Sequence, residues 1–110
     1  MPGRLTTHVL DNAKGRPAAG VTIELWRLEG GRQLVTRTTT NADGRSDGPL
    51  LEGDDLAPGA YELVFAIGPY FGADSFWTEV PVRFTIRDAS QHYHVPLLAS
   101  PWSYTTYRGS

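Results

Sequence analysis

Apolar and polar residues alternate along this chain in short runs, the pattern of β-strands that bury one face. In Tyr61–Ile67 the odd-numbered positions are all aromatic or aliphatic, and in Val80–Ile86 the even-numbered positions are apolar. Comparable strand-like runs are Arg4–Leu10, Val21–Leu28, Gln33–Thr39, His92–Ala99 and Ser103–Arg108. Seven or eight short strands at this spacing predict an all-β protein built as a β-sandwich.

Turns separate these runs, and 12 glycines and 8 prolines mark them. Gly30-Gly31 predicts a hairpin turn, and Asn41–Gly44 predicts a tight turn. Residues 48–59 predict a loop with one very short strand. Pro69–Phe76 is compatible with a short helical turn, which Gly72 weakens. The sequence therefore predicts at most one short helix.

Length and charge narrow the class of protein. A chain of 110 residues fits a single domain, residues 1–110. The net charge is −2, with 10 basic and 12 acidic residues and no run of five like charges, which disfavours nucleic-acid binding. No apolar run approaches the roughly 20 residues of a membrane helix, and the first residues lack the apolar core of a signal peptide. We therefore expect a soluble, cytoplasmic protein that does not associate with membranes.

Candidate chemistry rests on few side chains, since the chain has no cysteine and therefore no disulfide or thiol nucleophile. Histidine occurs three times, at His8, His92 and His94. Residues i and i+2 of a strand share a face, so His92 and His94 would lie opposite the core residue Tyr93. Three interpretations stay open at this point: histidines exposed on a strand, a three-histidine zinc site, or a general base.

Arg45 directly follows the predicted Asn41–Gly44 turn. Functional residues often lie on such turns, and a guanidinium suits planar anionic ligands. Most turn arginines are nevertheless simply solvated. The sequence contains no serine-nucleophile elbow, phosphate loop or H-E-x-x-H motif, so a hydrolytic reaction here would use direct attack by water.

The last strand-like run, Ser103–Tyr107, has high β-propensity and neither proline nor lysine to protect it as a sheet edge. Pairing with a second copy across a two-fold axis would cover that edge. An ordinary exposed edge is the alternative.

Three stretches together resemble one known family. They are LTTHVLD (Leu5–Asp11), TNADGR (Thr40–Arg45) and HYHVPLLASPWSYTTYRGS (His92–Ser110). They are similar to the 5-hydroxyisourate hydrolases, the transthyretin-related enzymes of urate breakdown, and the resemblance runs from Leu5 to Ser110. It implies a transthyretin-like two-sheet sandwich of eight strands. One departure is that residues 68–77 are short where the family has a longer helix.

The resemblance also implies an assembly and a reaction. Chains would pair through their last strands, and two dimers would form a homotetramer around a central channel, with active sites at the dimer–dimer interface. The substrate would be 5-hydroxyisourate, whose six-membered ring opens by hydrolysis of an amide to give 2-oxo-4-hydroxy-4-carboxy-5-ureidoimidazoline. No metal or other cofactor is expected.

Site residues follow from the same resemblance. The catalytic residues would be His8, Arg45, His94 and Ser110, and His8, Arg45, Tyr107 and Arg108 would bind substrate. One of the two histidines, His8 or His94, would accept the proton of the attacking water, and Arg45 would stabilise the developing negative charge. The YRGS ending, Tyr107–Ser110, would form a wall of the active site. His92 is a less certain member.

Three rival functions come from other classes. A transthyretin-like carrier of small ligands would share the fold and the channel but would not need the histidine and arginine set. A zinc hydrolase would use His8, His92 and His94 and would lose activity with a chelator. A structural β-sandwich module would show no turnover.

Overall fold

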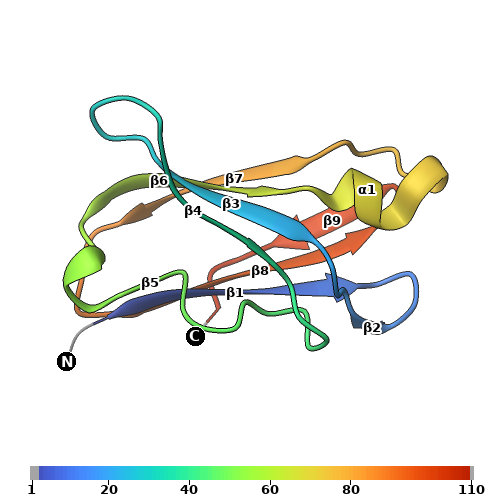
Figure 1. The fold of residues 1–110 in the computed structure, drawn as a ribbon, viewed down its shortest axis with the longest axis horizontal. Helices are drawn as coiled ribbons and strands as arrows, with labels where there is room; N and C mark the ends of the chain where they lie inside the picture. Colours follow the sequence, from blue (N-terminus) through green and yellow to red (C-terminus); the bar gives the residue numbers. More distant parts are fainter. Residues whose placement is uncertain (1–2, 110) are drawn as a thin grey trace.

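The computed structural model describes residues 3–109, which form two β-sheets packed face to face (Figure 1). The first sheet contains β1 (Arg4–Asp11), β2 (Arg16–Pro17), β5 (Leu51–Glu52), β8 (His92–Ser100) and β9 (Ser103–Thr106). The second contains β3 (Thr22–Arg27), β4 (Gln33–Thr39), β6 (Gly59–Phe65) and β7 (Val80–Ile86). The predicted sandwich is confirmed. Its seven longer strands match the predicted runs, and two strands of two residues each complete the first sheet.

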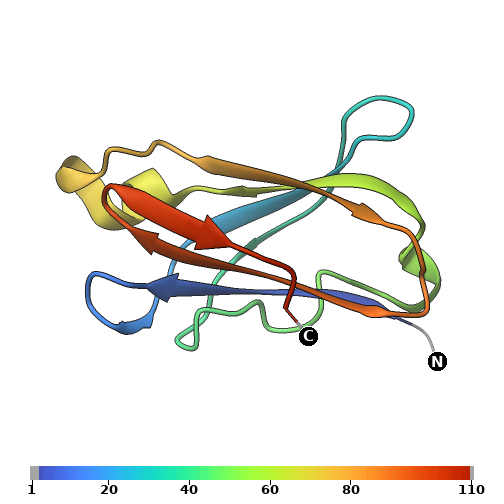
Figure 2. The ribbon, with the colours of Figure 1, turned by 180° about the vertical axis from the view of Figure 1, so that it is seen from behind.

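The strand order is β2-β1-β8-β9 in the first sheet, with β5 also paired to β1, and β4-β3-β6-β7 in the second. All pairs are antiparallel except β1 with β8, which run parallel over the whole length of β1. Figure 2 shows the side of the molecule where β9 and β7 lie at the edges of their sheets. The antiparallel β3–β4 pair confirms the hairpin at Gly30-Gly31.

The core lies between the sheets and is filled by the apolar positions of the alternating runs. The fully buried side chains include Leu5, Val9, Ile23, Leu25, Tyr61, Leu63, Phe65, Ile86 and Leu97. β6 departs from simple alternation, because Glu62 and Val64 on its other face are buried as well. Arginine side chains from neighbouring segments pair with Glu62 on that outer face.

One short helix is present, α1 (Ile67–Phe71), at one end of the sandwich (Figure 1). It begins before the expected Pro69–Phe76 segment, at Ile67, which the alternation assigns to a strand; that strand, β6, ends at Phe65. Gly72 follows α1 with a φ of 74°, a conformation that favours glycine and ends the helix. Two single 3₁₀ turns, Gly53–Asp55 and Gly72–Asp74, complete the helical segments. Within residues 3–109, no helix has the length and apolar character needed to span a membrane.

Candidate active site

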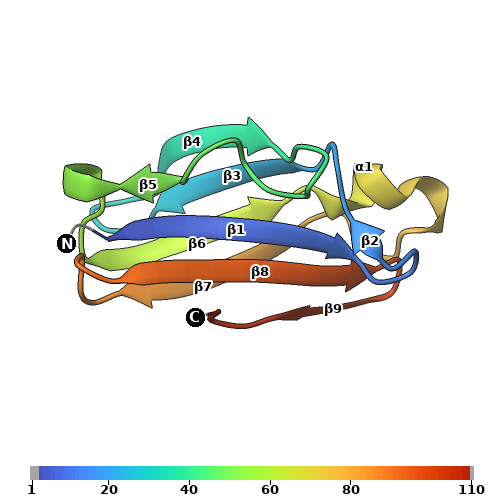
Figure 3. The same ribbon diagram turned by 90° about the horizontal axis from the view of Figure 1, so that it is seen from below.

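Parallel pairing of β1 with β8 places the histidines on the outer face of the first sheet. The register aligns Thr6 with His94 and His8 with Pro96, so these side chains come from adjacent strands (Figure 3). Thr7, like Val9 beside it, is buried, so Thr6 and His8 point away from the core. On β8, Tyr93 is buried whereas His92 is exposed and His94 only partly buried, so the prediction that both histidines lie opposite the core residue Tyr93 is confirmed.

Arg45 reaches this face because its turn is held against the edge of β1 between the short pairings with β5 and β2. The Val9 N–H donates to the Gly44 carbonyl at 2.8 Å. Gly44 has a φ of 76°, and a Cβ there would lie 2.3 Å from the Val9 carbonyl oxygen, so only glycine fits at this close approach. The predicted tight turn is confirmed by the Gly44 N–H bond to the Asn41 carbonyl, at 2.9 Å.

The Asn41 side chain organises the same turn from inside. Its Oδ1 accepts hydrogen bonds from the backbone N–H of Asp43 at 2.9 Å and of Arg45 at 3.2 Å. The Asn41 N–H in turn donates to the Arg45 carbonyl at 2.8 Å. These bonds fix the backbone that carries the Arg45 guanidinium.

His8 is tied to the same turn. Its Nε2 lies 2.8 Å from the Asp43 backbone carbonyl, which can only accept a hydrogen bond. Nε2 of His8 therefore carries a proton, and in the neutral ring the lone pair is on Nδ1.

Thr6 connects the other two histidines. Its Oγ1 lies 2.8 Å from His92 Nε2 and 2.8 Å from His94 Nδ1. With Nδ1 engaged, Nε2 is the nitrogen of His94 left for chemistry in the cavity that this residue lines.

The chain beyond β9 folds back onto His94. The Gly109 N–H donates to the His94 carbonyl at 2.7 Å. A Cβ on Gly109 would lie only 2.6 Å from His94 Cδ2, so glycine lets the tail pack directly against the imidazole. β9 ends at Thr106 rather than at the predicted Arg108, and Gly109 then makes an isolated antiparallel bridge to His94 of β8.

A cavity of about 450 Å³ opens on this face, and basic side chains dominate its lining. Arg4, Arg45, His92 and His94 contribute, together with Thr6, and no Asp or Glu of the described residues lines it. Partial burial lowers the pKa of His94, and the positive charge of Arg45 and the neighbouring histidines lower it further. The cavity therefore suits an electron-rich ligand and favours a neutral imidazole that can accept a proton.

The structure brings His94 and Arg45 together and adds His92, with His8 on the adjacent strand. Tyr107 and Arg108 lie elsewhere within the chain, lining a cavity of about 570 Å³ between the sheet edges. The Arg108 guanidinium stacks on the Tyr93 ring at 4.4 Å and donates to Gln91 Oε1 at 2.9 Å. In the single chain these two residues do not reach the histidine cavity, and Ser110 lies outside the described residues.

The zinc alternative needs three ligands in one place. Among residues 3–109, no group of three or more histidine or acidic side chains is arranged to hold a metal ion.

The positioning roles of Thr6, Asn41 and Gly109 were not anticipated, although Gly109 belongs to the YRGS ending that was expected to form a wall of the site. A signal existed for each. Thr6 lies two positions before His8 and so on the same strand face, and Asn41 is a residue type that bonds to its own turn. Gly109 follows a strand-like run, in a place where its lack of a side chain permits close packing.

Comparison with known proteins identifies the family of this chain. Residues 5–109 match the model of the HIUase/Transthyretin family. A 5-hydroxyisourate hydrolase 2 of Rhizobium meliloti is 58% identical over 98% of this chain and 97% of its own length. The chain therefore belongs to the HIUase/Transthyretin family.

Solved structures give the same result for the fold. A crystal structure of (S)-allantoin synthase matches 99% of this chain with a TM-score of 0.93 and 44% identity, although this chain spans only 44% of that longer one. Transthyretin from Sparus aurata matches with a TM-score of 0.88 and 28% identity, over 96% of both chains.

Proposed function

We propose that this protein hydrolyses 5-hydroxyisourate to 2-oxo-4-hydroxy-4-carboxy-5-ureidoimidazoline, as an enzyme of urate catabolism. The observation that carries the proposal is the cavity in which His94 and Arg45 meet without an acidic side chain among its lining residues. The high identity to the named hydrolase of Rhizobium meliloti supports the same conclusion.

The reaction adds the oxygen of water to the amide carbonyl carbon and breaks the ring carbon–nitrogen bond. One water proton passes to a histidine, which later protonates the leaving nitrogen. Arg45 stabilises the negative charge that grows on the carbonyl oxygen, where its fixed guanidinium donors are most effective. A neutral histidine is required for the first step, and the lowered pKa of His94 favours that form.

A non-catalytic carrier is the alternative. A carrier would need the channel and the fold but neither a base with a lowered pKa nor a turn built to hold Arg45. The identity to the hydrolase, 58%, against 28% to Sparus aurata transthyretin, favours the enzyme.

The proposal includes a homotetramer, a dimer of dimers with active sites at the dimer–dimer interface. The exposed aromatic side chains Tyr104 and Tyr107, 41% and 56% exposed in the single chain, support association along the β9 edge. In such an assembly, Tyr107, Arg108 and Ser110 would help to bind or orient the substrate. Light scattering tests the tetramer. A cytoplasmic location stays a prediction from the sequence.

The direct test is to add the protein to freshly prepared 5-hydroxyisourate and follow the ultraviolet absorbance. We expect decay well above the spontaneous rate, unaffected by a chelator. Decay at the spontaneous rate would favour the carrier, and chelator-sensitive decay would favour a metal enzyme.

A further inference from the structure

We propose that Thr6 is a positioning residue whose hydroxyl joins His92 and His94 into one proton relay, with the exposed His92 as its outer end. This inference rests on the proposed hydrolysis. It assigns roles to two residues, Thr6 and His92, that lie beside the His94–Arg45 pair.

The geometry restricts the protons of the two rings. Thr6 Oγ1 is 2.8 Å from a nitrogen of each imidazole, and a hydroxyl carries one proton. It can donate to only one of these nitrogens, so at least one of them must carry a proton of its own. The tautomers of His92 and His94 are therefore coupled through Thr6.

If Nε2 of His94 acts as the base, the hydrogen bonds that link His94, Thr6 and His92 must run in one direction. His94 Nδ1–H then donates to Thr6 Oγ1, and the Thr6 hydroxyl donates to His92 Nε2. Every donor has an acceptor, and the Nε2 lone pair of His94 is free for the water. In the opposite direction Nε2 would carry the proton, and His94 could not act as a base.

The relay also moves the positive charge from His94 to His92. When His94 Nε2 takes the water proton, its Nδ1 proton passes to Thr6 Oγ1 and the Thr6 proton passes to His92 Nε2. His94 is then neutral and holds a proton on Nε2 for the leaving nitrogen. As that proton is given up, the two transfers reverse and return a proton to His94 Nδ1, which restores the first state, so protons balance over the cycle.

The surroundings explain why His92 is the better place for the charge. The charged and titratable groups that act on His94 are Arg45 of the turn, His92 of β8 and His8 of β1, whereas Arg4 stands opposite His92 in the strand register and Arg108 donates to the His92 carbonyl at 3.4 Å. All are basic, and His94 is partly buried, whereas His92 is exposed to water. A positive charge on His92 is hydrated, because His92 is the exposed first residue of β8.

The test compares Thr6→Val, which removes the hydroxyl at nearly constant volume, with Thr6→Ser, which keeps it. Thr39→Val makes the same change at an exposed position of β4 and is the control. Long-range ¹H–¹⁵N NMR spectra identify the tautomer of each neutral histidine without any substrate. This readout stays valid even if the protein does not act on 5-hydroxyisourate.

We expect neutral His94 to be protonated on Nδ1 in the wild type and in Thr6→Ser, and on Nε2 in much of Thr6→Val. We expect kcat to fall about 10-fold to 100-fold in Thr6→Val, with KM little changed, which is less than the loss of a general base. Wild-type tautomers in Thr6→Val, or full activity without the hydroxyl, would overturn the relay.

A double-mutant cycle tests the role of His92. If both residues act in one relay, His92→Ala should lower kcat and Thr6→Val should add little in that background. Independent, multiplicative effects of the two substitutions would show that Thr6 and His92 are not coupled.

Discussion

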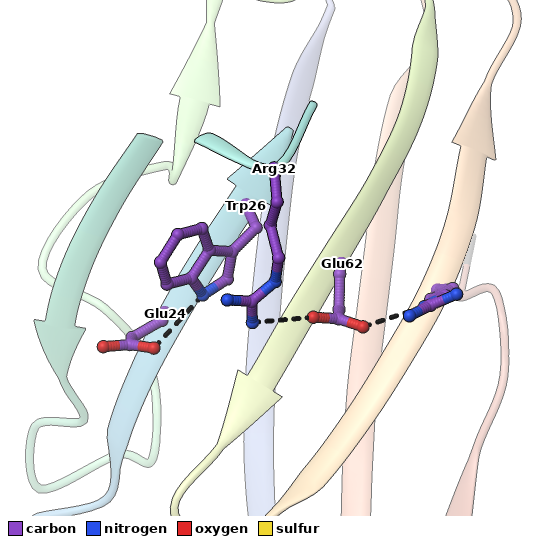
Figure 4. Close-up of polar contacts among 5 residues, drawn as sticks. Glu24, Trp26, Arg32 and Glu62 are labelled. Atoms are coloured by element: carbon purple, nitrogen blue, oxygen red, sulfur yellow. Dashed lines mark hydrogen bonds and ion pairs between the residues drawn. The ribbon is translucent and has the colours of Figure 1, made fainter. Parts of the chain in front are cut away.

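The two outer faces of this sandwich handle charge in opposite ways. On the second sheet, Glu62 accepts from Arg32 at 3.0 Å and from Arg83 at 2.9 Å, as Figure 4 shows for the labelled Arg32 and Glu62. Arg32 also stacks over Trp26 at 3.7 Å. Opposite charges are thus brought together around a carboxylate that is 5% exposed.

The first sheet carries like charges instead. Around the cavity, arginine and histidine side chains meet with no carboxylate of the described residues among them. The consequences for pKa differ accordingly. Hydrogen bonds from Arg83 hold the pKa of Glu62 below its ordinary value against the opposing effect of burial, whereas burial and neighbouring cations lower the pKa of His94.

The difference separates stability from function. The two arginine partners keep Glu62 charged. The charges around Glu62 are therefore paired within the protein and need no ligand. His94 is kept neutral and Arg45 unopposed, so the other face gains from binding an electron-rich molecule. The face on which like charges gather is therefore the one where we place the catalytic site.

The largest expected effect is loss of catalysis on the histidine face. His94→Ala should lower kcat/KM by about 10²–10⁴-fold, the usual contribution of a general acid–base group. His8→Ala and Arg45→Ala should also slow the reaction strongly, without unfolding the protein. The absorbance assay with 5-hydroxyisourate measures this, and near-normal rates in all three variants would mean that the site has been assigned wrongly.

Gly109→Ala should give an intermediate loss. The added methyl would lie 2.6 Å from His94 Cδ2, so the imidazole or the tail must move. Misplacement of about 1 Å can cost up to roughly 10²-fold, and we expect about 10-fold or more. Gly68→Ala is the matched control, because a Cβ there would also lie 2.6 Å from a neighbouring atom, the Thr78 carbonyl oxygen, but in α1 and outside the lining of the histidine cavity. Equal activities of the two variants would show that close packing against His94 is unimportant.

Glu62→Ala should act on stability rather than on catalysis. Removing the acceptor of two arginines should lower the free energy of unfolding by about 1–2 kcal/mol, since both arginines are substantially exposed. Arg37→Ala, which breaks a 3.8 Å exposed pair with Glu24, should have almost no effect. Urea unfolding and the activity assay together check both statements. A large loss of turnover in folded Glu62→Ala would contradict the assignment of stability to one face and catalysis to the other.

The stability contribution of Glu62 should depend on pH. Its folded pKa lies below the ordinary value of 4.5, so the contribution is present above that value and is lost as the pH falls through the folded pKa. Unfolding curves of wild type and Glu62→Gln should therefore converge in acid. Curves that stay equally far apart would contradict the assigned cause.

The smallest expected effect is a shift in the titration of His94. Arg45→Gln removes a cation that lowers the pKa of His94, so that pKa should rise, while Arg45→Lys should leave it nearly unchanged. Because burial is the larger cause, the rise should be only part of the way to the usual value. NMR titration of the His94 ring measures it. An unchanged pKa in Arg45→Gln would mean that Arg45 does not act on His94.

Local patterns predicted the sandwich, its turns and the sides of the strands. Period-two alternation placed His92 and His94 outward because the core dictates which face is inside. Alternation could not show that β1 and β8 are neighbours, nor that Thr6 faces both His92 and His94, since both depend on long-range pairing. It also missed the burial of Glu62, which arginines from distant segments produce. Nor did it reveal that Tyr107 and Arg108 lie apart from the histidine cavity within one chain.

The pairing of β1 with β8 has a consequence for folding. Thr6 and His94 are 88 positions apart, so the contact between them closes one of the longest loops in the molecule. Closing such a loop costs chain entropy before any local contact offsets it, and proteins rich in such contacts fold slowly. During synthesis, a chain that has emerged only as far as β7 holds His8 and Arg45 but lacks β8, the strand that pairs with β1 along its whole length. Catalytic competence should therefore appear in one late, cooperative event.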